Sequence, residues 1–213
     1  MDDRVTLSVI VPTRGRGSLA STLASVAEQL DPGDELLVLC NDDDDFGNSA
    51  RQSLLERARG THVVFMDDDD QYARGAFDAM RRFARDHPGR VGIFRMRFLD
   101  GRLLWSEPLL RRTNVSTQMF CVPNVPERLG SWTAAAAEGA SRPYVADFEF
   151  ISQTVELQGE PLFREEVVAL IRSDRRSLVR AWQRATVVPR AVARRVRALG
   201  PLRSGRRPGG TRG

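Results

Sequence analysis

The first hundred residues alternate short apolar runs with segments whose apolar residues recur at helical spacing. Three runs rich in β-branched and other large apolar residues predict buried strands at 7–11, 35–40 and 62–66. After each run, apolar residues three or four positions apart predict helices over 19–30, 54–58 and 77–84. This alternation is typical of an α/β protein with a doubly wound, mostly parallel sheet.

From residue 91 onward the pattern indicates a small antiparallel addition to that sheet. Apolar residues alternate over 91–99, Asp100-Gly101 predicts a tight turn, and 102–105 is expected to pair back as an antiparallel strand. Further strands are predicted at 118–122 and 162–171, with a helix between them. Residues 134–141 are small and polar and predict a mobile loop, which Trp132 precedes. Trp132 fits two roles, stacking on the ring of a bound ligand or packing in the core.

Charge divides the chain into two regions. The sequence has 213 residues and no lysine, so its 32 basic residues are all arginines. Residues 172–213 carry a net charge of +12, whereas residues 1–171 carry −8. Apolar residues at helical spacing continue into the arginine-rich part. We therefore predict one globular domain over 1–171 and a basic, amphipathic, helical and partly disordered tail over 172–213.

Composition excludes several classes of protein. An acidic body is a poor general nucleic-acid binder, because neutralising phosphates needs a positive surface. No run approaches the ~18 apolar residues of a membrane span, and the Met-Asp-Asp start does not resemble a signal peptide. Cys40 and Cys121 both lie in apolar runs and are predicted to be buried core residues of a reducing compartment. We expect a cytoplasmic protein.

The arginine-rich tail leaves three interpretations open. Its apolar stripe flanked by arginines is suited to an anionic membrane surface, which would place the protein peripherally at the inner face of the membrane. The tail is equally suited to docking on an acidic partner, or to serving only as a solubilising end. Nucleic acid is disfavoured as a partner, since the tail has no aromatic stacking platform.

Chemically unusual loops follow each of the first three predicted strands. They are PTRGR at 12–16, NDDDD at 41–45 and DDDD at 67–70. The carboxyl ends of parallel strands meet at one edge of a sheet, where ligands bind. Four adjacent carboxylates repel one another, so residues 67–70 require either a nearby cation or carboxylates that stay protonated. Carboxylates are suited to a hard cation, Mg²⁺ or Mn²⁺, which commonly also bridges to substrate phosphates. For residues 42–45 alone, a solvated acidic loop is an equally good explanation.

These loops carry a resemblance to a known family. The segment SVIVPTR at 8–14, followed by FMDDDD at 65–70, resembles glycosyltransferase family 2, whose members have the GT-A nucleotide-sugar fold. The resemblance covers roughly residues 5–171. In that family several segments contact the nucleotide sugar. The resemblance implies that the matching residues here are Pro12, Thr13, Arg14, Asp42, Asp43, Arg51, Asp67 and Asp68. Gln52 stands where the family usually has asparagine.

The resemblance also implies a metal site and a catalytic base. The D-x-D motif of the family falls on Asp67 and Asp69, with Asp69 as the main ligand of Mn²⁺ or Mg²⁺ and Asp70 assisting. The family's base follows an acceptor loop in a Glu-Asp pair, which PYVADFE at 143–149 matches in part. Asp147 corresponds to the aspartate of the pair, while Ala146 replaces the glutamate, so Glu149 is a reserve candidate. A helix N-cap is the structural alternative for Asp147.

Together these features predict an inverting, metal-dependent glycosyltransferase. It would move a sugar from a nucleotide-diphosphate donor, a UDP-sugar by default, to a hydroxyl of a sugar, a glycolipid or a small molecule. Two alternatives remain: a nucleotidyltransferase acting on sugar phosphates, and a non-catalytic module that binds a nucleotide sugar or a partner. Pyrophosphate release from nucleoside triphosphates would indicate the first alternative, and donor binding without turnover the second.

Overall fold

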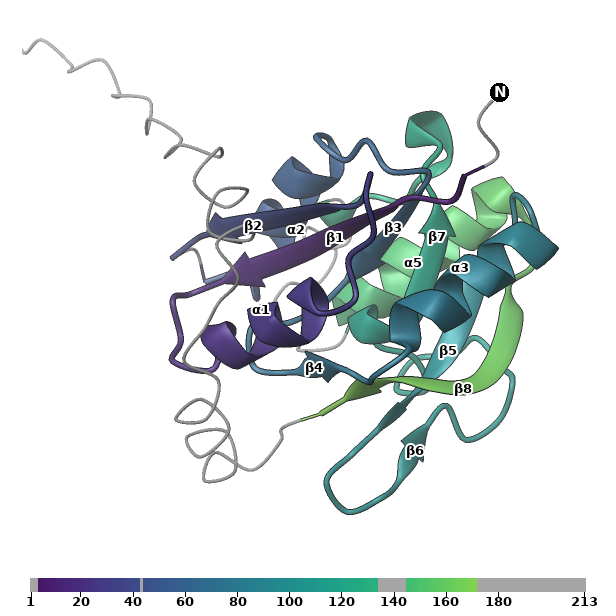
Figure 1. Cartoon of the computed structure of the whole chain (residues 1–213). Helices are drawn as coiled ribbons and strands as arrows, with labels where there is room; N and C mark the ends of the chain where they lie inside the picture. Colours follow the sequence, from purple (N-terminus) through teal and green to yellow (C-terminus); the bar gives the residue numbers. More distant parts are fainter. Residues whose placement is uncertain (1–3, 43, 134–144, 172–213) are drawn as a thin grey trace, which may run out of the picture.

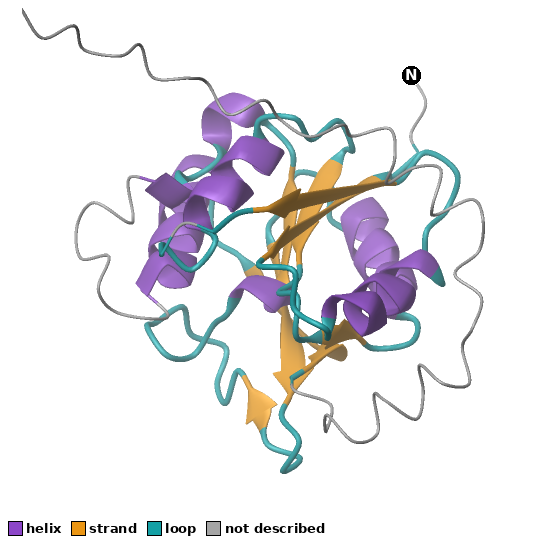
Figure 2. Cartoon of the chain, turned by 90° about the vertical axis from the view of Figure 1, so that its left-hand side faces the viewer, coloured by secondary structure: helices purple, strands orange, loops and turns teal. Residues whose placement is uncertain are grey.

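The predicted alternation folds into one mixed sheet with helices on both sides (Figures 1 and 2). The computed structural model describes residues 4–42, 44–133 and 145–171, so the predicted loop at 134–141 and the tail lie outside the described residues. The strands are β1 Leu7–Thr13, β2 Glu35–Cys40, β3 His62–Phe65, β4 Gln71–Tyr72, β5 Gly92–Arg97, β6 Leu103–Leu104, β7 Phe120–Pro123 and β8 Leu162–Leu170. The helices are α1 Leu19–Ala27, α2 Asn48–Leu55, α3 Ala76–Asp86 and α5 Val145–Gln158, with 3₁₀ turns η1 Thr117–Met119 and η2 Pro126–Arg128.

The sheet has the order β2-β1-β3-β7-β5-β8-β4, and β6 pairs with β5. β1 is parallel to β2 and β3, and β5 is parallel to β8. β7 is antiparallel to both β3 and β5, and β4 is antiparallel to β8. Five of the strands, β1, β2, β3, β5 and β8, therefore run in the same direction. This confirms the mostly parallel sheet, and the pairing of β6 with β5 confirms the antiparallel hairpin. The two-residue strand β4 was not predicted, because it is too short to show a periodic pattern.

The direction of β7 positions the residues that precede it. In the β3–β7 ladder Val64 pairs with Cys121 and His62 with Pro123. The start of β7 therefore lies beside the end of β3, at the edge where β1, β2 and β3 all terminate. Turn η1, directly before β7, is thereby brought next to the acidic segment that follows β3.

Helices α1 and α3 cover one face of the sheet, and α2 and α5 cover the other (Figure 1). On the α2–α5 face, Trp132 is fully buried and stacks on Phe150, with ring centroids 4.3 Å apart. Phe65 of β3 meets both rings edge-on, at 5.3 and 5.4 Å. Of the two roles open for Trp132, the structure shows core packing.

The two cysteines differ in their surroundings. Cys121 in β7 is buried, and burial raises the pKa of its thiol to about 12. The prediction that Cys40 is also buried was wrong, since the residue is exposed. Cys40 is the last residue of β2, an edge strand, where the sheet no longer covers it. Within the described residues, no helix combines the length and apolar character needed to cross a membrane.

A buried ion pair joins β1, the α1–β2 connection and α3. Asp34 accepts hydrogen bonds from the backbone N–H groups of Leu7 and Asp31, each at 2.8 Å, and forms an ion pair with Arg81 of α3. Both charged side chains are almost wholly buried. Arg81 also donates to the Gln29 carbonyl at 3.2 Å. A buried pair of this kind stabilises only as long as both partners are present.

Asp34→Ala is therefore expected to lower the free energy of unfolding by about 3 kcal/mol, because it leaves a buried guanidinium and two N–H groups poorly paired. Urea denaturation of the variant and the unsubstituted protein measures the loss. Asp78→Ala is the control, since Asp78 also lies 3.6 Å from Arg81 but its side chain is 73% exposed. A control loss as large as that of Asp34→Ala would contradict this account.

Candidate active site

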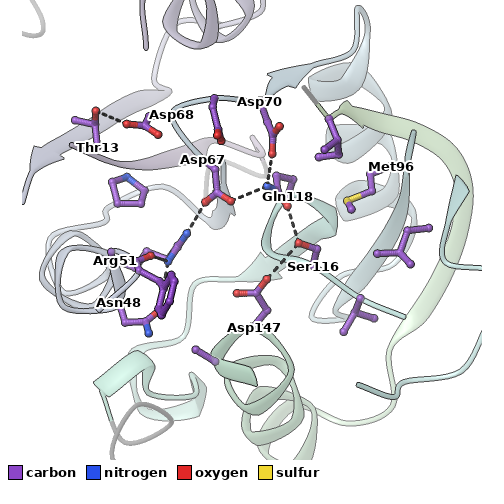
Figure 3. Close-up of a pocket in the computed structure, with 18 of the residues that line it drawn as sticks. Thr13, Asn48, Arg51, Asp67, Asp68, Asp70, Met96, Ser116, Gln118 and Asp147 are labelled. Carbon is purple, nitrogen blue, oxygen red and sulfur yellow. Dashed lines mark hydrogen bonds and ion pairs between the residues drawn. The ribbon is translucent and has the colours of Figure 1, made fainter. Parts of the chain in front are cut away.

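A cavity of about 630 Å³ opens at the carboxyl edge of the parallel strands. Its walls come from the segments that follow β1, β2 and β3, from the β5–β6 hairpin, from residues before β7, and from the start of α5. Figure 3 shows acidic, amide and guanidinium side chains pointing toward one another from these separate elements. A volume of this order is typical of pockets for small-molecule ligands.

Most of the sequence-predicted site residues line this cavity. They are Pro12, Thr13, Arg14, Arg51, Asp67, Asp68, Asp69, Asp70 and Asp147. From the loop after β2, Asn41, Asp44, Phe46 and Gly47 line the cavity, whereas Asp42 is exposed and does not. Asp43 lies outside the described residues. Glu149 is also not among the lining residues, and its carboxylate accepts a hydrogen bond from Arg112 at 2.5 Å.

Asp67 is held between a cation and an amide. Arg51 pairs with its Oδ1, and the side-chain nitrogen of Gln118 donates to its Oδ2 at 2.9 Å. Burial raises the pKa of Asp67, and the nearby charges of Asp147 and Asp69 raise it further, while Arg51 opposes the rise. Arg51 stabilises the ionised form of Asp67, but the net effect of burial and the neighbouring charges is a raised pKa.

Arg51 extends from α2 and is itself fixed on several sides. Its guanidinium donates to the Phe46 carbonyl at 2.9 Å and to Asn48 Oδ1 at 3.3 Å, and it lies over the Trp132 ring, 5.1 Å from the centroid. Gly47 makes the turn before α2 at φ +80°, and a Cβ there would lie 3.0 Å from Pro12 Cβ. The turn therefore requires glycine, and it delivers Arg51 to Asp67.

Asp68 fixes the loop after β1 to the loop after β3. Its Oδ2 accepts hydrogen bonds from the Thr13 hydroxyl at 2.8 Å and from the Arg14 N–H at 3.0 Å. The residue is only 6% exposed. Its position indicates that it holds the two loops together at the cavity wall.

Asp69 and Asp67 are the more accessible members of the acidic run. Their side chains are 35% and 34% exposed, whereas Asp70 is buried and accepts from Gln118 at 2.7 Å. Arg16 lies 2.8 Å from Asp69 and 3.2 Å from Asp68. Among the described residues, no group of three or more His, Cys, Asp or Glu side chains is arranged to hold a metal by itself. One or two carboxylates completed by substrate phosphates is nevertheless an ordinary donor set for Mg²⁺.

Asp147 faces this acidic run across the cavity (Figure 3). It is the third residue of α5, in the first turn, where the helix dipole favours an anion. Its Oδ2 accepts from the Thr117 backbone N–H at 3.1 Å and from the Ser116 hydroxyl at 3.2 Å. Asp147 lies within the first turn of α5 and not before it, so the N-cap alternative is not observed.

Among the cavity residues that contact the predicted site carboxylates, Ser116 and Gln118 were not singled out from the sequence. Arg16 was considered only as part of the PTRGR loop, whose guanidinium groups are suited to a nucleotide or phosphate. Ser116 and Gln118 belong to no recognisable motif, and they reach the cavity because β7 runs antiparallel to β3. Their role depends on strand direction, which local sequence does not specify.

Arg51→Lys is expected to destabilise the protein by about 2 kcal/mol, because an ammonium does not reproduce a guanidinium that is shared among three acceptors and packed on an indole. Chemical denaturation measures the loss. Arg57→Lys, at an exposed position just after α2, is the matched control and is expected to change stability by less than about 0.5 kcal/mol. Equal stability of the two variants would show that the Arg51 contacts contribute little.

The fold was compared with those of known proteins. No family model matches the sequence, and neither does any curated protein. The structure matches that of S. aureus TarS 1-349, with 17% identity and a TM-score of 0.57, over 78% of this chain and 60% of that chain. TarS 1-349 in complex with UDP-GlcNAc matches with 16% identity and a TM-score of 0.55, over 79% of this chain and 59% of that chain. The complex of TarS 1-349 with UDP has the same identity and a TM-score of 0.54, over 90% and 65%.

The match is one of architecture, since less than a fifth of the residues are identical. The chain also spans under two thirds of the length of the TarS chains it matches. At this level of identity the agreement in structure concerns the fold. The fold implied by the sequence resemblance is confirmed: the chain has the GT-A fold.

Proposed function

We propose that this protein is an inverting, metal-dependent glycosyltransferase that uses a nucleotide-diphosphate sugar, with UDP-sugars as the first donors to test. The observation that carries the proposal is the convergence of Arg14, the acidic run at 67–70 and Asp147 on one cavity of about 630 Å³. Two structures with the same fold hold UDP and UDP-GlcNAc, which supports a uridine donor. The acceptor would present a hydroxyl group.

In this proposal the donor lies along the carboxyl edge of the sheet. Pro12, Thr13 and Arg14 would border the nucleotide, and Arg14 would add a positive charge near the phosphates. Arg16 is placed to contribute a second charge, since its guanidinium already lies within the cavity next to Asp69. Guanidinium groups are suited to phosphates because several N–H donors lie in one plane.

Asp69 and Asp67 would hold Mn²⁺ or Mg²⁺, with Asp70 behind them. Their oxygens are hard ligands of the kind these ions prefer, and both side chains are partly accessible from the cavity. When bound, the ion supplies positive charge that stabilises the departing nucleoside diphosphate. Arg16 would have to leave Asp69 for the ion to bind, and it would then be free to approach the phosphates.

Asp147 would act as the general base on the acceptor side. With Oδ2 held by Ser116 and Thr117, the carboxylate can take the proton of an acceptor hydroxyl through Oδ1. The deprotonated oxygen attacks the anomeric carbon as the bond to the diphosphate oxygen breaks. A single displacement of this kind inverts the configuration at that carbon.

Binding is tested by thermal shift with UDP, GDP, dTDP and ADP, each with and without Mn²⁺. We expect one nucleoside diphosphate to raise Tm only when Mn²⁺ is present, and Asp69→Asn to remove at least about nine tenths of the affinity, as losing a charged metal ligand does. Asp86→Asn, at an exposed position at the end of α3, is the control and should bind normally. Equal stabilisation with and without Mn²⁺ would contradict metal dependence.

Catalysis is tested by turnover of UDP-GlcNAc and other UDP-sugars, with water or an offered sugar as acceptor. Asp147→Asn is expected to lower kcat about 100-fold or more while UDP binding persists, because it removes only the base. Glu156→Gln, at an exposed position on α5, is the control. A loss confined to Glu149→Gln would move the base to that residue, and release of pyrophosphate from UTP would indicate a nucleotidyltransferase instead.

A further inference from the structure

Within residues 4–42, 44–133 and 145–171, the carboxylate of Asp147 accepts hydrogen bonds through one of its two oxygens. Oδ2 accepts both the Thr117 N–H and the Ser116 hydroxyl, at 3.1 and 3.2 Å. Oδ1 receives no hydrogen bond from any residue in the part of the chain that the structure describes. This arrangement fixes the plane of the carboxylate and leaves one oxygen for a proton from outside.

Gln118, two residues after Ser116, contacts the opposite wall of the cavity, which is formed by the acidic run after β3. Its side-chain nitrogen donates to Asp67 Oδ2 at 2.9 Å and to Asp70 Oδ2 at 2.7 Å, which uses both of its protons. The residue is 2% exposed. A flipped amide would turn its oxygen toward two carboxylates, so the orientation of Gln118 follows from its surroundings.

Ser116 joins the two sets of contacts. Its hydroxyl lies 2.8 Å from Gln118 Oε1 and 3.2 Å from Asp147 Oδ2, as the dashed lines in Figure 3 show. A hydroxyl has one proton, so Ser116 shares it between these two acceptors. A continuous series of hydrogen bonds therefore runs from Asp147 through Ser116 and Gln118 to Asp67 and Asp70.

The backbone that carries this series is buried. Ser116, Thr117, Gln118 and Met119 are all buried, and η1 leads directly into β7, which lies between β3 and β5 in the sheet. The Ser116 N–H is also satisfied by Met119 Sδ, at 3.2 Å. Side chains on such a segment have little freedom to follow a displaced Asp147 or Asp67.

We propose that Ser116 and Gln118 are positioning residues that make the base and the donor-binding carboxylates one hydrogen-bonded unit. The inference rests on the proposed function and goes beyond it, because it assigns roles to two residues outside the D-x-D motif and the base. Ser116 acts through Asp147, and Gln118 acts through Asp67 and Asp70. When Asp147 takes the acceptor's proton, its carboxyl becomes neutral and a weaker acceptor, and the Ser116 hydroxyl keeps its proton and donates its hydrogen bond to Gln118 Oε1.

The test is a double-mutant cycle on the full chain with UDP-GlcNAc turnover and UDP·Mn²⁺ affinity as readouts. Ser116→Ala is expected to lower kcat about 10-fold with the affinity for UDP·Mn²⁺ unchanged, and Ser116→Thr to restore kcat because it keeps the hydroxyl. In an Asp147→Asn background, Ser116→Ala should cause no further loss, since its partner is already disabled. Gln118→Leu should weaken UDP·Mn²⁺ binding about 10-fold.

Ser152→Ala is the matched control. It removes a buried hydroxyl that makes no hydrogen bond to the described residues, on the same helix as Asp147, and kcat should not change. If Ser116→Ala lowers kcat equally with and without Asp147, or if Ser116→Thr fails to restore it, the proposed role of Ser116 is overturned. Unchanged UDP·Mn²⁺ affinity in Gln118→Leu overturns the proposed role of Gln118.

A separate measurement distinguishes failure of the inference from failure of the proposed function. If the unsubstituted protein binds no UDP·Mn²⁺ and turns over no donor, the proposed function is wrong. The same cycle read by Tm then decides whether the unit exists. Less-than-additive Tm losses for Ser116→Ala and Asp147→Asn support it, and strictly additive losses overturn it.

Discussion

Repulsion among carboxylates at one edge of the sheet is the constraint that the rest of the site depends on. Asp67, Asp69 and Asp70 follow β3, and Asp147 is close enough to raise the pKa of Asp67. Arginines from other elements offset this negative charge. The Arg51 side chain is buried beside Asp67, whereas that of Arg16 is exposed beside Asp69. Each contact involves a particular carboxylate oxygen. Among the described residues, Arg16 contacts Oδ2 of Asp69, and Ser116 and Thr117 contact Oδ2 of Asp147, which leaves the other oxygen of each available at the cavity.

The topology of the sheet explains how these groups come together. Parallel strands bring the loops after β1, β2 and β3 to one edge, as in other α/β proteins. The antiparallel strand β7 adds a segment that enters the same edge from the opposite direction. Through Ser116 and Gln118 this segment contacts both the α5 side and the β3 side of the cavity. In the proposed enzyme, the segment before β7 would therefore position both the base on the acceptor side and the carboxylates on the donor side.

Sequence patterns predicted most of the elements and much of the cavity lining. The runs that became β1, β2 and β3 are strongly apolar, and their polar loops follow directly, so Asp67 and Arg14 could be placed at one edge. Contacts set by tertiary structure could not be predicted. Cys40 lies in an apolar run yet is exposed at the end of an edge strand, and Gln118 depends on the direction of β7.

The central claim is that Asp69 holds a divalent cation against the phosphates of a bound nucleotide. A crystal structure of the full chain with UDP and Mn²⁺, with anomalous diffraction measured for manganese, tests this directly. The account predicts a manganese peak within bonding distance of an Asp69 carboxylate oxygen and of phosphate oxygens, with Arg16 moved off Asp69. Bound UDP with no manganese at Asp69, and with the Arg16–Asp69 ion pair intact, would contradict it.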